Sequence, residues 1–276
     1  MLLGTGAGPV EGRPRHMTSH VLVSNGAAYI VDCGLGVTTQ LAHTGIPFSS
    51  VRSIYITHHH PDHNVEYGPF LLLRWTRGIT QSPSCYGPPP LAQMTRDYLR
   101  SMDATIRFWS EDFQFAPLKV DDVHEITGSG PVMKDENVSV SSVLVQHPPV
   151  RPAFGYRFDF TDRSIAFSGD TVPLEAVARM AKGADVLVHE AIDMAAMDRH
   201  ERQHDSPAEY KIAMHHMRAD HSPIEDVGRI AQEAGVKTLV LSHLAPSIGV
   251  PDELWRANAA KHFKGKIIVG HDLMVI

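Results

Sequence analysis

The stretch that decides the fold is Thr57-His58-His59-His60-Pro61-Asp62-His63, which follows an apolar run at residues 51–56. Four of its side chains are potential metal ligands in an H-x-H-x-D-H array: His58, His60, Asp62 and His63. In an extended strand the first two would point to one face, and a turn at Pro61 would bring the other two toward the same space. An exposed polar turn is the alternative, but it is a poor structural choice directly after a buried strand. The array therefore predicts a site for two cations, with His59 in an orienting role.

The bulk composition is that of an ordinary globular protein. The chain has 276 residues, of which 43% are hydrophobic and 20% are charged. We expect residues 1–276 to form one domain, because no repeat, low-complexity tract or linker divides them. The net charge is −6, and the Lys and Arg residues do not cluster. We therefore do not expect nucleic acid as a partner, since phosphate-backbone contacts require clustered positive charge.

The two cysteines, Cys33 and Cys85, do not form a disulfide framework, and there is no cationic start followed by an apolar core. No run approaches the roughly 18 apolar residues needed to span a membrane. A cytoplasmic protein without membrane contact is the expectation. The 18 histidines are the one compositional oddity, and they favour a metal-rich or acid–base site.

The pattern along the chain alternates between strand and helix signals. Strands are predicted at residues 21–24, 28–32, 51–56, 120–126, 138–146, 153–160, 164–167, 186–189 and 238–242, with a hairpin turn at Asn25-Gly26. Helices are predicted at residues 34–42, 66–77, 91–102, 173–182, 207–217 and 223–234. Two β-rich blocks, each followed by helices, indicate two mixed sheets packed together with helices outside.

The glycine-rich start at residues 1–9 invites comparison with a phosphate-binding loop. It lacks the G-K-[ST] ending and the spacing of a dinucleotide fingerprint, so it predicts a loop after a very short first strand. That short strand fits a gene that begins upstream of Met1.

Ligand-type side chains also follow four later strands at the points where those strands end. They are His147, Asp170, His189 with Glu190, and His243. The carboxyl ends of strands are where open sheets gather active-site residues. Two cations a few ångströms apart need an anion between them, and a carboxylate can bridge where an imidazole cannot. Asp170 is the predicted bridge.

Together these motifs resemble the metallo-β-lactamase superfamily, and within it the ribonuclease Z and arylsulfatase-like branch. The likeness runs along most of the chain: Leu3-Gly4-Thr5-Gly6, Asp32-Cys33-Gly34, the array, residues 152–158, Ser168-Gly169-Asp170-Thr171, His189-Glu190-Ala191, His221-Ser222 and Leu241-Ser242-His243. The array marks only the superfamily, whereas the H-E-A and H-S motifs are more specific to the branch. The resemblance implies an α+β fold, the four-layer αββα sandwich.

The resemblance also implies a dinuclear hydrolase with two zinc ions, for which manganese or iron are alternatives. One ion would take His58, His60, His147 and Asp170, and the other would take Asp62, His63, His243 and Asp170. The catalytic candidates are Asp62, His221 and Glu190, with His221 as the general acid and Glu190 holding its imidazole. A water shared by the ions would attack phosphorus, sulfur or a carbonyl carbon. For His221 and Glu190, the alternative is an ordinary surface histidine beside a solvated glutamate.

Ribonuclease Z carries a long arm after its G-Y-R segment that grips tRNA. Here the segment Gly155-Tyr156-Arg157 runs almost directly into Ser168-Gly169-Asp170, which leaves no room for that arm. The predicted partner is therefore a small-molecule ester, with a phosphodiester or aryl sulfate ahead of a carboxylic ester or lactone. Residues 193–220 are long enough to form a helical lid over such a substrate, or simply to pack.

Other functions remain open behind this one. A glyoxalase-like thioester hydrolase shares T-H-H-H-x-D-H, but the H-E-A and H-S motifs argue against it. A tRNA 3′-processing endonuclease is disfavoured by the missing arm. A non-catalytic scaffold is disfavoured because such chains lose ligands, and all seven ligand positions are filled. A homodimer is compatible with each of these functions.

Overall fold

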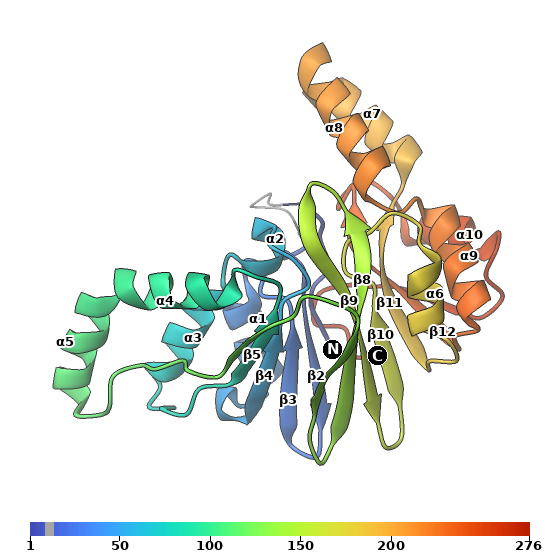
Figure 1. Ribbon diagram of the computed structural model, residues 1–276. Helices are drawn as coiled ribbons and strands as arrows, with labels where there is room; N and C mark the ends of the chain where they lie inside the picture. The colour runs from blue at the N-terminus through green and yellow to red at the C-terminus, as the bar shows by residue number, and fades with distance from the viewer. Residues whose placement is uncertain (9–13) are drawn as a thin grey trace.

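The computed structural model describes residues 1–8 and 14–276, and it places two β-sheets face to face with helices on both outer sides (Figure 1). The first sheet has the strand order β1 to β6. Its strands are β1 (Leu2–Gly4), β2 (Ser19–Ser24), β3 (Ala27–Val31), β4 (Val51–Tyr55), β5 (Ser84–Gly87) and β6 (Val123–Glu125). Strands β1 to β3 are antiparallel neighbours, whereas β3 to β6 run parallel.

The second sheet has the order β13-β12-β11-β10-β9-β8-β7. Its strands are β7 (Gly130–Lys134), β8 (Val138–His147), β9 (Val150–Phe160), β10 (Ser164–Phe167), β11 (Val186–Ile192), β12 (Thr238–Ala245) and β13 (Lys266–Val269). Strands β7 to β10 are antiparallel, and β10 to β13 are parallel. Because parallel strands all end at one edge, each sheet delivers several strand ends to the same side of the molecule.

The inner faces of the two sheets are joined by an aromatic core. The ring of Tyr55 on β4 lies edge-on to Phe158 on β9, with centroids 5.0 Å apart, and 5.6 Å from Tyr156. All three side chains are fully buried. Edge-to-face packing of this kind adds roughly 0.5–1.5 kcal/mol per pair beyond the burial of apolar area. This core holds the two sheets, and therefore their strand ends, in one fixed relationship.

Helices cover the two outer faces (Figure 1). On the first sheet these are α1 (Val37–Thr44), α3 (Tyr67–Trp75), α4 (Leu91–Ser101) and α5 (Asp103–Phe113), and on the second α6 (Glu175–Met180), α9 (Ile224–Ala234) and α10 (Asp252–Ala260). Helix α9 buries Ile224, Val227 and Ala231, which follow the helical repeat. A Cβ at Gly228 would lie 2.4 Å from the Ala259 carbonyl oxygen, so glycine permits α9 to pack closely on α10.

A helical hairpin, α7 (Met194–His204) and α8 (Pro207–Asp220), projects from the sheet edge above β11 (Figure 1). Helix α8 begins with a capping box in which the Ser206 and Glu209 side chains satisfy each other's backbone N–H groups. The Tyr210 hydroxyl donates to Asp198 on α7 at 2.6 Å. Residues 193–220, for which a helical lid or simple packing was expected, thus form a pair of helices tied together near their tip.

The predicted αββα sandwich is confirmed, although several short elements escaped the sequence patterns. Strands β5, β7 and β13 were not predicted: β5 and β7 contain Gly or Pro, which are depleted in strands, and β13 has only four residues. The strand predicted at residues 120–126 contracts to β6, and helices α5 and α10 were not expected. The loop predicted after β1 runs into residue 9, outside the described residues. Among the described helices, none is both long and apolar enough to cross a membrane.

Candidate metal centre

The array forms a loop between β4 and the short helix α2 (Pro61–Asn64) at the edge where the strands end. His60 is still extended, with φ −95° and ψ 151°, and Pro61 then occupies the first helical position, where its missing N–H costs nothing. This change of direction turns Asp62 and His63 back toward His58. All three side chains are buried, as expected for ligands and not for a solvated turn.

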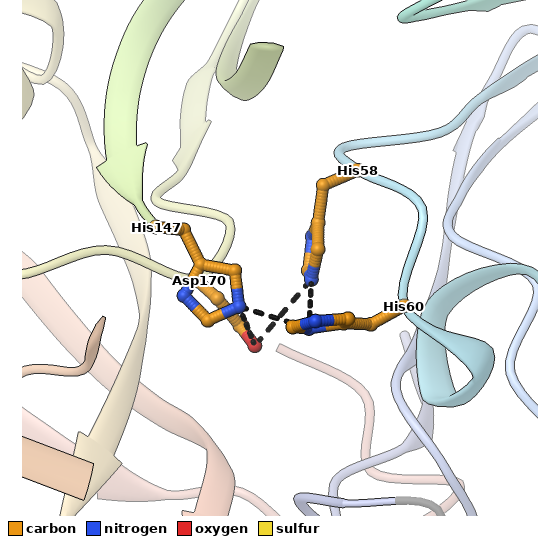
Figure 2. Close-up of side chains that lie close together, drawn as sticks. All are labelled: His58, His60, His147 and Asp170. Carbon is orange, nitrogen blue, oxygen red and sulfur yellow. Dashed lines mark hydrogen bonds and ion pairs between the residues drawn. The ribbon is translucent and has the colours of Figure 1, made fainter. Parts of the chain in front are cut away.

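The first cluster joins two array histidines to two residues of the second sheet (Figure 2). His60 Nδ1 lies 3.2 Å from His58 Nε2 and 2.9 Å from His147 Nε2. Asp170 Oδ2 lies 3.8 Å from His58 Nε2 and 3.9 Å from His147 Nε2. Figure 2 shows His58 and His60 approaching from one side and His147 and Asp170 from the other, so that the three imidazoles and the carboxylate converge.

The second cluster combines α2 with strand β12. Asp170 Oδ2 lies 3.2 Å from His63 Nε2 and 3.0 Å from His243 Nε2. Asp62 Oδ2 lies 3.2 Å from His243 Nε2 and 3.7 Å from His63 Nε2. One oxygen of Asp170 therefore approaches ligand-type atoms of both clusters, which is the position that a bridging carboxylate requires.

Asp170 reaches this position because Gly169 precedes it. Gly169 has a φ of +60°, and a Cβ there would lie 2.4 Å from the Phe154 carbonyl oxygen of β9. Only glycine fits both the left-handed conformation and the close approach. The seven predicted ligand positions thus form two groups that share Asp170. Within each group, the candidate ligand atoms all lie within 4.8 Å of one another.

A family model described as a β-lactamase superfamily domain matches residues 28–244. The ribonuclease Z of Mycobacterium bovis (strain BCG / Pasteur 1173P2) is 32% identical over 287 residues, which cover 99% of this chain and 95% of that protein. The ribonuclease Z of Mycobacterium sp. (strain KMS) is 35% identical over 279 residues, with 99% and 93% covered. The chain belongs to the ribonuclease Z branch of the metallo-β-lactamase superfamily. It is a metal-dependent hydrolase.

Solved structures agree on the fold of this metallo-β-lactamase superfamily member. The short form of human tRNase Z superposes with a TM-score of 0.72 at 23% identity, covering 100% of this chain and 97% of that one. The metallo-β-lactamase fold protein YhfI from Bacillus subtilis has a TM-score of 0.70 at 19% identity, with 98% and 95% covered. At these identities the likeness establishes the architecture.

Several features of the clusters fit a divalent metal. His63 Nε2 and Asp170 Oδ1 are buried and have no hydrogen-bond partner among the described residues. Two ring nitrogens, His58 Nε2 and His147 Nε2, also lie within hydrogen-bond distance of His60 Nδ1, and one proton cannot link all three nitrogens. Tetrahedral zinc with Zn–N bonds of about 2.0–2.1 Å would hold its ligand atoms about 3.3 Å apart, close to the spacing seen here. The residues of this hydrolase therefore suit a divalent cation.

The protonation of the first cluster also suits a metal, because a ligand imidazole must be neutral. Burial and the neighbouring histidines lower the pKa of His58 well below its ordinary value, and burial lowers that of His60 to about 4. Burial opposes ionisation of Asp170, but His243 and His63 hold the pKa of its carboxyl well below the ordinary value. The cluster thus presents free nitrogen lone pairs and a charged carboxylate.

In the second cluster, the carboxylates favour the protonated form of the two imidazoles. Burial opposes protonation of His243, but Asp170 and Asp62 raise its pKa to about 10. The pKa of His63 is likewise raised well above its ordinary value by the surrounding carboxylates. A cation bound here would displace these protons, so it would compete with them.

Asp32 supports the array from behind, at the end of β3. His63 Nδ1 lies 2.8 Å from Asp32 Oδ2, and the Thr57 N–H donates to Asp32 Oδ1 at 2.8 Å. The Thr57 hydroxyl donates to Oδ2 at 2.9 Å and lies 3.0 Å from His58 Nδ1. The sequence pattern marked Asp32 only as part of a turn motif, although its place after a strand was the signal that singled out Asp170.

His221 and Glu190 lie beside the clusters as a buried pair. His221 Nδ1 is 2.8 Å from Glu190 Oε2, and Glu190 Oε1 accepts from the Thr171 N–H at 2.6 Å. Burial lowers the pKa of His221, but Glu190 and then Asp170 raise it by more, so the net shift is upward. The alternative of a surface histidine with a solvated glutamate is wrong, because both side chains are at least nine-tenths buried.

Two other histidines named from the sequence are not among the seven predicted ligands. His189 Nδ1 lies 2.8 Å from the Glu190 carbonyl oxygen, its Nε2 is buried without a hydrogen-bond partner among the described residues, and the residue lines a cavity of about 20 Å³ together with His63, Asp170 and His243. His59 Nε2 lies 2.8 Å from the Pro88 carbonyl oxygen and its Nδ1 is 3.0 Å from Asn64. His59 thus braces the array loop, in keeping with its predicted orienting role.

Proposed function

We propose that this hydrolase is a phosphodiesterase that works with two zinc ions. The seven residues that would hold them are His58, His60, Asp62, His63, His147, Asp170 and His243. Their nitrogen and oxygen donors suit zinc, and manganese or iron would also fit. The observation that carries the proposal is the His221–Glu190 pair, because a buried imidazole held by a carboxylate next to a two-cation site is the arrangement that protonates a leaving group. We also propose that residues 1–276 act as one domain.

The chain's own residues divide the chemistry between them. Two cations held by the residues of the two clusters would supply Lewis acidity and acidify a water molecule. Asp62, whose carboxyl pKa is held below its ordinary value by His63 despite burial, accepts a hydrogen bond from the attacking water and orients it. As the bond from phosphorus to the departing oxygen breaks, His221 transfers its Nε2 proton to that oxygen. Glu190 keeps the His221 ring in position and favours its protonated form.

The shape of the site favours a small substrate. A cavity of about 310 Å³ opens over the clusters, and its wall includes Asp62, His221, Ile192 and Met217. This is at the lower end of the range for small-molecule sites. Strand β9 ends at Phe160 and β10 begins at Ser164, so only three residues connect them and no arm projects there. A small phosphodiester is therefore the proposed substrate, with an aryl sulfate as the nearest alternative chemistry.

RNA is the second candidate substrate. The mycobacterial relatives are named ribonuclease Z, which favours an RNA substrate. This weakens the expectation, based on the net negative charge, that nucleic acid is not a partner. Both candidates share the phosphodiester bond and the same proposed catalytic groups. They differ in which contacts supply the binding energy. A small ester would be bound by contacts within the cavity, whereas RNA would be bound by contacts along a long polyanion.

A direct comparison of substrates tests the proposal. Metal-loaded protein would be assayed with bis(p-nitrophenyl) phosphate, p-nitrophenyl sulfate, a lactone, a thioester and a tRNA precursor with a 3′ extension. We expect the phosphodiester to be hydrolysed with the highest kcat/KM of the small substrates. Faster, site-specific cleavage of the precursor would favour the RNA candidate, and preference for the thioester or lactone would contradict the phosphodiesterase.

A further inference from the structure

The projecting hairpin brings a histidine that the catalytic proposal does not use to the cavity over the clusters. His216, in the last turns of α8, lines the 310 Å³ cavity together with His60 and His221. Its ring centroid lies 6.3 Å from that of His60 and 5.0 Å from that of His221. The sequence pattern placed His216 only within a possible lid. The structure places it next to His221, on the side of the cavity where the proposed function puts the departing oxygen.

A buried carboxylate one helical turn later fixes the His216 ring. His216 Nδ1 lies 2.5 Å from Asp220 Oδ2, an i,i+4 pair on α8. The Asp220 side chain is only 9% exposed, whereas that of His216 is 36% exposed. The Asp220 backbone carbonyl also accepts from His147 Nδ1 at 2.8 Å, which anchors the end of α8 to β8. His216 is therefore held rigidly, with its Nε2 edge turned to the cavity.

The two histidines on this side form a fork. His216 Nε2 lies 3.3 Å from His221 Nε2. Both Nδ1 atoms are already committed to carboxylates, His216 to Asp220 and His221 to Glu190. Two ring nitrogens that face each other in this way leave room for one oxygen atom that lies about 2.8 Å from both. In the free protein one of the two Nε2 atoms can accept a hydrogen bond from the other, and a substrate oxygen would replace this contact. Neither ring depends on the other for its orientation, since each is held by its carboxylate.

We propose that His216 is a second substrate-contacting residue, which donates its Nε2–H to the departing oxygen of the substrate. This inference rests on the proposed function, in which His221 delivers the proton to that oxygen. The bond from phosphorus to the departing oxygen breaks, its electron pair stays on the oxygen, and the His221 proton neutralises it. His216 keeps its own proton and stabilises the developing charge by hydrogen bonding. Because only an N–H is needed, a glutamine amide should serve in its place.

The experiment compares His216→Ala, His216→Gln and the matched control His215→Ala, whose side chain is an exposed neighbour on α8. Each metal-loaded protein is assayed with aryl phosphodiesters whose phenols span a range of pKa. We expect His216→Ala to lower kcat/KM by about tenfold to a hundredfold, the usual range for a hydrogen bond to a charged group, and most strongly for the most basic phenols. His216→Gln should recover most of this loss, and His215→Ala should match the wild type.

A binding measurement separates this inference from the proposed function. Calorimetric titration of the metal-loaded proteins with inorganic phosphate should show a Kd about tenfold higher in His216→Ala than in His215→Ala. If the wild type cleaves no phosphodiester but this difference in Kd is found, the proposed function fails and the His216 contact stands. Equal phosphate affinity and equal kcat/KM in His216→Ala and His215→Ala would overturn the inference. A loss of bound metal in His216→Ala would also overturn it, because His216 would then support the ligand His147.

Discussion

His221 Nδ1 lies 2.8 Å from Glu190 Oε2, and the same His221 atom lies 3.9 Å from Asp170 Oδ2, the oxygen shared by the two clusters. The acid candidate thus lies next to the metal centre and is not one of the seven predicted ligands. It does form a third group of ligand-type side chains with Asp170, Glu190 and His243. Its Nδ1 is occupied by Glu190, so its Nε2 is the nitrogen that can reach a substrate. Metal content and turnover, measured separately, distinguish the role of ligand from that of acid.

His221→Ala should spare metal binding and slow turnover selectively. With the proton donor removed, the departing oxygen leaves as an anion, so substrates with basic leaving groups should lose the most. We expect losses of about 10²–10⁴-fold for alkyl or weakly acidic phenol leaving groups and smaller losses for nitrophenols. Metal content per chain and kcat across a leaving-group series measure this. Uniform slowing of every substrate would count against the acid role.

Asp32→Asn should weaken metal binding without removing a ligand. The buried carboxylate accepts from Thr57 and orients His63 through its Nδ1, and an amide nitrogen in its place would oppose the ring N–H. Loss of such a supporting contact typically costs about 10–100-fold in metal affinity. Competition with a chromogenic chelator measures the change, with Asp97→Asn on the exposed face of α4 as the control. Unchanged affinity would show that Asp32 does not support His63.

The site was largely predictable because its residues obey a local rule. His147, Asp170 and His243 each come where a strand stops, and because β8, β10 and β12 run in the same direction, their ends meet at a common edge of the sheet. The array adds its own signal, because buried polar residues after a strand need a partner. The array motif, the strand ends and the family resemblance therefore indicated the candidate ligands without any distance information.

The features that the sequence did not predict depend on tertiary geometry. His216 is one of several histidines in residues 193–220, and only the angle of the hairpin decides that it, and not the exposed His215, faces the cavity. Strand β13 lies at the edge of its sheet and has four residues, so its pairing with β12 supplies what its sequence pattern lacks. Both depend on contacts between segments far apart in the chain.

Asp185 offers a test of stability. It lies just before β11, at the end of the second sheet that faces away from the metal centre. The Lys237 ammonium and the backbone and hydroxyl of Ser164 donate to it, and they lower its pKa to about 2. A carboxyl with a lowered folded-state pKa stabilises the protein above its unfolded-state value near 3.9 and loses this contribution as the pH falls toward 2. Asp185→Asn should therefore lower the urea midpoint at pH 6, and the difference from the wild type should narrow between about pH 4 and pH 3.

The same variant serves as a control for function. Asp185 lies at the start of β11, whereas the metal centre lies where the strands end, so kcat/KM at pH 7 should stay within about twofold of the wild type. A difference in urea midpoint that does not change with pH would mean that the ionised form of Asp185 is not responsible for its effect.

The most direct test of the dinuclear account is the metal content of the wild type and of Asp170→Ala, measured together with phosphodiesterase activity. The wild type should carry about two divalent ions per chain. Asp170→Ala removes the one oxygen that approaches both clusters, so it should lose metal and activity together. Full activity in Asp170→Ala, or an active wild-type protein free of metal, would contradict the account.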